Sequence, residues 1–111
     1  MSSSVVISGI SGRFPECENV SQLRHHLLAN NDLITEDERR WPSGLYGLPI
    51  RSGKLRELSK FDAQYFGVHG QQANFIDPQL RLLLETSVEA VVDAGLPRSY
   101  FYHAHFSITR C

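Results

Sequence analysis

The stretch DPQLRLLLETSVEAVVDAG, residues 77–95, decides how the fold of this sequence is interpreted. The side-chain oxygen of Asp77 suits the position before a helix, where free N–H groups need an acceptor. Pro78 suits the first helical position because its missing N–H costs nothing there, and Gly95 suits the left-handed residue after a helix. The sequence therefore predicts a helix over 78–94.

The predicted helix carries one apolar face. Leucine and valine side chains recur at helical spacing, and charged side chains lie on the other side. The apolar positions are Leu80, Leu83, Leu84, Val88, Val91 and Val92. We expect this stripe, above all Leu84 and Val88 in its middle, to be buried against another part of the fold.

Shorter elements lie upstream of this helix. FDAQYFG at 61–67 spaces its aromatic residues as a helical turn would, and the turn should end at Gly67. Residues 32–60 hold several glycines and prolines without a long apolar period, so they predict a loop with at most one helical turn. A loop of this length is unusual in a small domain, which points to a functional loop or to a segment that lies on a larger body.

A second helix and a strand are predicted near the start of the chain. Asn19 or Ser21 is placed to cap a short helix that stops at Asn30 and Asn31. One face of this helix carries Val20, Leu23, Leu27 and Leu28. The β-branched run at 5–7 predicts a buried strand.

Size and composition place the chain among globular proteins. It has 111 residues, 41% of them hydrophobic, and a formal net charge of −1, so no global charge favours nucleic acid or an anionic membrane. It contains no apolar run near the roughly 20 residues that span a bilayer, and its first residues do not resemble a secretory signal. Its two cysteines are too few for a disulfide framework, which favours a reducing compartment such as the cytoplasm.

Several residues are candidates for a chemical role. The glycines of residues 8–12 lie between a predicted strand and a helix, but they match no phosphate-loop spacing, so a turn is favoured. His103 and His105 share a strand face near Cys111, but they lack further zinc ligands. Cys17 and Cys111 lack the surroundings of an activated nucleophile. A structural role is favoured for all of them.

The charged clusters also favour structural readings. Four cations fall within ten residues: Arg51, Lys54, Arg56 and Lys60. They could meet an acidic partner, but solvated surface is the commoner explanation. Glu36, Asp37 and Glu38 lack metal-loop spacing, and Glu85 with Glu89 fits a solvated helix face.

Two long motifs, FDAQYFG at 61–67 and DPQLRLLLE at 77–85, resemble the N-terminal part of β-ketoacyl synthase domains. The segments RRW, GLYGLP and RSGKL, between residues 39 and 55, resemble the animal-type, multifunctional fatty acid synthase. The segment VVISGISGRFPE at 5–16 resembles the start of the same domain in that synthase. The resemblance covers residues 4–96, about a quarter of such a domain, and it leaves 97–111 as a divergent tail.

The resemblance implies an α/β fold, namely the N-terminal fragment of a thiolase-like layered fold, mostly helix and loop with one or two strands. It also implies decarboxylative condensation by a cysteine and two histidines. Those residues lie in later segments of the family, so no catalytic, cofactor-binding or metal residue is assigned here. The implied thioesters are carried on acyl carrier protein phosphopantetheine, and the family is homodimeric.

Three functional interpretations remain open from the sequence. The leading one is a truncated fatty acid synthase homologue, related to the acyl-transferring condensing step and inactive alone. A second is a non-catalytic binding module that docks on an intact synthase or an acyl carrier protein through the basic loop. In the third, the sequence is an incomplete version of a full-length fatty acid synthase.

Overall fold

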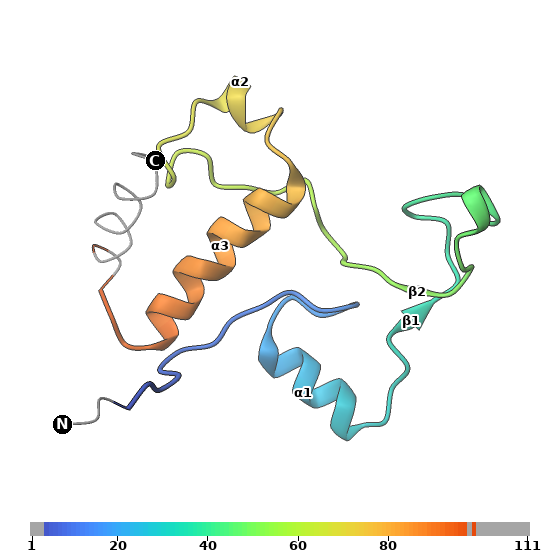
Figure 1. Cartoon of the computed structure of the whole chain (residues 1–111), viewed down its shortest axis with the longest axis horizontal. Coiled ribbons are helices and arrows are strands. Elements are labelled where there is room, and N and C mark those ends of the chain that lie inside the picture. Colours follow the sequence, from blue (N-terminus) through green and yellow to red (C-terminus); the bar gives the residue numbers. More distant parts are fainter. Residues whose placement is uncertain (1–3, 98, 100–111) are drawn as a thin grey trace. The chain divides into compact units, whose positions relative to one another are not determined.

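The computed structural model describes residues 4–97 and residue 99, and it divides the chain into two compact units (Figure 1). One, here the terminal unit, is Met1–Ser11 with Ser59–Cys111, of which 4–11, 59–97 and 99 are described. The other, the central unit, is Gly12–Leu58. In the described residues no helix is long and apolar enough to cross a membrane.

The terminal unit is built on α3, Pro78–Asp93. Asp77 caps it by accepting from the Gln79 N–H at 2.7 Å, and Gly95 follows with a left-handed φ of 75°. The predicted start, first proline and end of this helix are confirmed. A short helix that the sequence analysis did not predict, α2 over Gly70–Ala73, lies just before α3.

The segment 61–67 forms the predicted turn. The Phe66 N–H donates to the Asp62 carbonyl, and Gly67 takes a left-handed φ of 65°. The rings of Phe61 and Phe66 stack with their centroids 5.1 Å apart. The helical turn ending at Gly67 is confirmed.

One prediction for the terminal unit is wrong, and another holds only in part. Residues 5–7 form no strand, and Val5 and Ile7 are more than 90% exposed. On α3 the expected buried stripe is buried only at Val88, whereas Leu83 is 61% exposed. A strand needs a hydrogen-bonded neighbour and an apolar face needs a covering element; the described part of the chain gives 5–7 no such neighbour and covers the stripe of α3 only in part.

The central unit begins with a turn and α1, Val20–Leu28. Asn19 caps α1 by accepting from the Gln22 N–H at 2.9 Å, and Asn30 after it has a φ of 54°. Both ends of this helix match the prediction. The predicted apolar face is only partly covered, because Leu27 is 64% exposed.

The rest of the central unit is the predicted loop, held by a short pair of strands. β1, Ile34–Thr35, pairs antiparallel with β2, Ser52–Gly53. A single 3-10 turn, η1 over Leu45–Gly47, lies between them. Strands of two residues are too short to leave an alternating pattern, which explains why the sequence did not reveal them.

Candidate functional site

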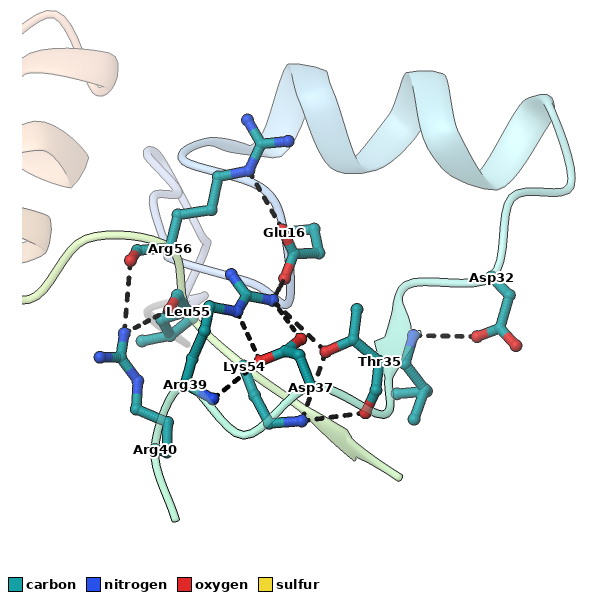
Figure 2. A network of polar contacts seen from close by, with 10 residues as sticks. Glu16, Asp32, Thr35, Asp37, Arg39, Arg40, Lys54, Leu55 and Arg56 are labelled. Atoms are coloured by element: carbon teal, nitrogen blue, oxygen red, sulfur yellow. Dashed lines mark hydrogen bonds and ion pairs between the residues drawn. The ribbon is translucent and has the colours of Figure 1, made fainter. Parts of the chain in front are cut away.

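Glu16 lies at the centre of the polar contacts in the central unit. Two backbone hydrogen bonds between Phe14 and Cys17, of 2.9 and 3.0 Å, close the turn that carries it, and Glu16 adopts a φ of 56°. The turn presents the carboxylate to two guanidinium groups (Figure 2). Arg39 donates to one oxygen, and Arg56 Nε lies 3.2 Å from the other. One carboxylate therefore joins two separate parts of the long loop to this turn.

Arg39 shares its guanidinium between two carboxylates. Besides Glu16, it donates to both oxygens of Asp37 at 2.7 and 2.9 Å, and to the Thr35 hydroxyl at 3.3 Å. Hydrogen bonds from Arg39 are the main cause of the lowered pKa of Glu16 and of Asp37. The contact with Asp37 is the main cause of the raised pKa of Arg39. All three groups are charged at neutral pH, and the directions of the shifts show that the fold favours their charged forms.

Lys54 is a buried cation beside this network. Its side chain is 2% exposed, and Nζ donates to the Thr35 carbonyl at 2.9 Å and to the Thr35 hydroxyl at 3.3 Å (Figure 2). Its own carbonyl accepts from the Glu16 N–H at 3.1 Å. Lys54, the residue after β2, therefore connects β1 to the turn that carries Glu16 through these hydrogen bonds.

The other loop cations also have partners within the central unit. Arg51 contacts Asp32 and lies 3.4 Å from a Glu36 oxygen. Arg40 donates to the Leu55 carbonyl at 2.5 Å. The pKa of Asp32 is lowered, first by the hydrogen bond that it accepts from the Ile34 N–H and then by Arg51. Of the predicted basic loop, Arg51, Lys54 and Arg56 therefore bind their own chain, and Lys60 belongs to the terminal unit.

Each side chain of the acidic cluster 36–38 has a partner within the central unit. Glu36 lies near Arg51 and Asp37 binds Arg39. Glu38 accepts from the Ser43 N–H at 2.9 Å, a contact that lowers its pKa. In the described residues no group of three or more histidine, cysteine or acidic side chains is arranged to hold a metal.

The glycine-containing segment 8–12 contacts acidic side chains of α3. The Ile10 N–H donates to Asp93 Oδ2 at 2.9 Å, and the Ser11 hydroxyl donates to Glu89 Oε2 at 2.5 Å. An N–H already bound to a carboxylate is not available to a phosphate, and the carboxylates repel an anion. This segment is a packing turn, as the spacing favoured.

The candidate nucleophile and histidines do not form a reactive pair in the described residues. Cys17 is free but only 3% exposed, so an incoming thioester does not reach its thiol. His25 and His26, adjacent on α1, have ring centroids 5.8 Å apart, and His26 Nδ1 lies 3.0 Å from the Asn31 amide nitrogen. The candidates His103, His105 and Cys111 lie outside the described residues.

The ion-pair network is the feature that the sequence analysis missed. A signal for it was present, because the acidic run 36–38 directly precedes Arg39 and Arg40 in a loop that later carries more cations. At Gly53 an added Cβ would lie 2.6 Å from Pro15 Cγ, a close approach that only the structure reveals. A glycine that admits another segment so closely indicates that distant parts of the loop meet there.

Comparison with known proteins gives one consistent result. Residues 2–107 match the family described as "Beta-ketoacyl synthase, N-terminal domain", a match that extends past Leu96 into the predicted tail. The chain is 58% identical over 92 residues to a fatty acid synthase of the goose Anser anser anser, covering 83% of this chain and 26% of that protein. It is 35% identical over 107 residues to polyketide synthase PksL of Bacillus subtilis (strain 168), covering 86% of this chain and 2% of that protein.

A solved structure is similar as well. The ketosynthase from module 6 of the bacillaene synthase of Bacillus subtilis 168 superposes with a TM-score of 0.71 at 31% sequence identity. The superposition covers 78% of this chain and 16% of that chain. The chain thus spans about a quarter of the goose relative and a smaller share of the ketosynthase.

Proposed function

Because this chain belongs to the β-ketoacyl synthase family, as a form of its N-terminal domain close to fatty acid synthase, we propose that it supplies the N-terminal portion of a condensing domain. The observation that carries this proposal is the 58% identity to the goose fatty acid synthase over 83% of the chain. The family membership also confirms the predicted fold class, a fragment of a thiolase-like α/β fold that is mostly helix and loop.

The role proposed for this portion is structural. In the described residues the polar groups of the central unit bind one another, and the buried Cys17 is not paired with a histidine. Nucleophilic catalysis needs an accessible nucleophile with a base in hydrogen-bond reach. We therefore propose that the chain alone does not condense acyl units, and that the nucleophile and histidines of the reaction come from later segments of a complete domain.

Within this structural role, the ion-pair network around Glu16 holds the long loop in place. Glu16 holds both Arg39 and Arg56, and Lys54 holds Thr35, so loop 32–58 is fixed at several points. A loop fixed in this way presents a constant surface to whatever covers it. The acyl carrier protein thioesters, the homodimeric assembly and the cytoplasmic location of the implied parent enzyme belong to the same proposal.

Docking on the rest of a synthase is the second proposed role. It is favoured by large apolar side chains that are more than 90% exposed, among them Val5, Ile7 and Phe75. The basic loop is a weaker docking surface for an acidic carrier protein than its sequence suggested. Three of its cations, Arg51, Lys54 and Arg56, already bind groups of their own chain.

A chimera tests the proposed function directly. The 92 matched residues of the goose fatty acid synthase are replaced by those of this chain, and condensation is followed by release of CO₂ from malonyl thioester. We expect the chimera to retain condensing activity within about tenfold of the parent, since conserved packing tolerates volume-matched changes. A chimera with the same oligomeric state as the parent but without condensation would contradict the proposal.

The isolated chain provides a second test of the proposed function. After incubation with acyl-CoA and malonyl-CoA, its intact mass should not change, because no activated nucleophile is proposed in it. Stable acylation that a Cys17→Ala or Cys111→Ala substitution removes would contradict the structural role.

A further inference from the structure

The loop between β1 and β2 has an uncharged tip, residues 42–50, which contains η1 and lies at the far end of the loop from the two strands (Figure 1). Tyr46 in this tip is 92% exposed. Its φ of 51° is unusual for a residue other than glycine, and Gly44 and Gly47 beside it have φ values of 78° and 72°. These left-handed residues turn the chain sharply and leave the Tyr46 ring in solvent.

The tip is only weakly tied to the rest of the central unit. Beyond Ser43, whose N–H donates to Glu38, the backbone hydrogen bonds of the tip in the described structure stay within it. The N–H groups of Leu45 and Gly47 donate at 3.3 and 3.4 Å, which is longer than the usual range. A Cβ added at Gly44 or Gly47 would meet nothing within 4 Å. The tip can therefore open locally while β1 and β2 stay paired.

The base of the loop is fixed on both sides of Tyr46. β1, before the tip, pairs with β2, after it. Lys54 Nζ donates to the Thr35 carbonyl at 2.9 Å, and Arg56 Nε lies 3.2 Å from a Glu16 oxygen. Each of these contacts joins a residue before Tyr46 to a residue after it, so a break in the chain at the tip would leave them in place.

An exposed segment that opens locally is what an endopeptidase requires of its substrate. The side chain of Tyr46 is of the kind that fills an apolar specificity pocket, such as the slot of chymotrypsin. Trp41 and Leu48 are poorer sites, because each is followed by a proline, which is rigid and has no N–H. Exposure, local opening and side-chain chemistry therefore meet at Tyr46.

The cations of the loop do not offer the same access to an endopeptidase with an acidic pocket. Lys54 is 2% exposed, and Arg39 and Arg51 bind carboxylates of their own unit. Such a pocket must take up the charged side chain, so these contacts would have to break first. The structure thus favours cleavage at the aromatic residue over cleavage at the basic ones.

We propose that the bond between Tyr46 and Gly47 is a site of proteolytic modification by an endopeptidase with an apolar, aromatic-binding pocket. One water molecule is consumed as this amide bond breaks, so that Tyr46 gains a carboxylate and Gly47 an ammonium group. The two products, 1–46 and 47–111, stay bound to each other through the base of the loop. This inference concerns the isolated chain and is independent of the proposed function.

Limited proteolysis of the full chain, followed by intact mass spectrometry, tests this site. Chymotrypsin and trypsin are used at doses that cut the urea-denatured chain equally fast. Within residues 4–97 of the native chain, the first chymotryptic cut should follow Tyr46, and it should precede any tryptic cut within 32–58. The two products should elute together from a sizing column in native buffer and separately in urea.

Tyr46→Gly removes the ring but accepts the left-handed φ, and it should slow chymotryptic cutting of the loop at least about tenfold. Phe75→Ala is the matched control, because Phe75 is 91% exposed but lies in the short link between α2 and α3. It should leave the cut after Tyr46 unchanged, and both variants should keep the circular dichroism of the wild type. A first cut elsewhere within 4–97, a loop cut as fast in Tyr46→Gly as in wild type, or products that separate in native buffer would overturn the proposal.

Discussion

At the scale of single residues, Gly9 shows how closely the start of the chain lies on α3. A Cβ added at Gly9 would lie 2.1 Å from the carbonyl oxygen of Ala90, which is closer than any real contact. The next residue, Ile10, donates its N–H to Asp93. The glycine is therefore required by packing, and the hydrogen bond depends on that close approach.

We predict that Gly9→Ala destabilises the terminal unit by about 1–3 kcal/mol, the usual cost of forcing extra atoms into a packed contact. Gly70→Ala is the matched control, because an added Cβ there meets nothing within 4 Å. It should be neutral or slightly stabilising. Urea unfolding followed by far-UV circular dichroism measures both, and equal midpoints for the two variants would show that Gly9 is not packed on α3.

Glu16 makes the central unit sensitive to acid. Its pKa is lowered in the folded chain, chiefly by the hydrogen bond from Arg39, so folding favours the charged carboxylate. This contribution is fully present above the unfolded-state pKa of about 4.3 and is lost as the pH falls through the lower, folded-state pKa. The carboxylates of Asp37 and Asp32 act in the same direction.

We predict that Glu16→Gln destabilises the central unit at pH 7 by up to about 1 kcal/mol, the range of partly exposed ion pairs. The difference from wild type should shrink toward zero as the pH falls below about 4. Urea unfolding followed by the fluorescence of Trp41, the single tryptophan, reports on this unit. Glu18→Gln on the same turn is the control, and a Glu16→Gln effect independent of pH would argue against the ion pairs.

At the scale of elements, sequence and structure agree where the signal is local. Asp77, Pro78 and Gly95 each act through their nearest neighbours, so the bounds of α3 could be predicted from them. The sequence did not predict how much of the apolar face of α3 is buried. An amphipathic pattern shows which face favours burial, but not whether the covering element lies within the same chain.

We predict that Val88→Ala lowers the stability of the terminal unit by about 1–3 kcal/mol, because Val88 is the buried position of the stripe. Leu83→Ala removes a larger side chain from an exposed position and should change stability by less than about 0.5 kcal/mol. Hydrogen exchange of the α3 amides gives both values. A larger effect at Leu83 than at Val88 would mean that the stripe is packed around Leu83 and not around Val88.

The ion-pair network illustrates what sequence patterns leave undetermined. The contacts of Glu16 with Arg39 and Arg56 span 23 and 40 residues. Neither a helical nor a strand period relates residues so far apart, and the basic loop therefore looked like free surface. Its pairing depends on β1 and β2, which are too short to be predicted.

At the scale of the whole molecule, the described residues bury few large hydrophobic side chains and expose many. Large hydrophobic side chains are exposed in both units, including Val5 and Leu83 in one and Leu28 and Tyr46 in the other. The chain also spans only 26% of the goose relative and 16% of the ketosynthase chain. Both facts fit a portion of a condensing domain whose apolar faces are meant to be covered.

Amide hydrogen exchange of the isolated chain, at a concentration where sedimentation finds monomer, tests this central claim most directly. We predict protection in α3 and around the Glu16 network, with fast exchange at 5–7 and tertiary packing that opens easily. Uniformly strong protection from Val5 through Leu96 in the monomer would contradict the claim, since it would show a self-sufficient domain that needs no further segments.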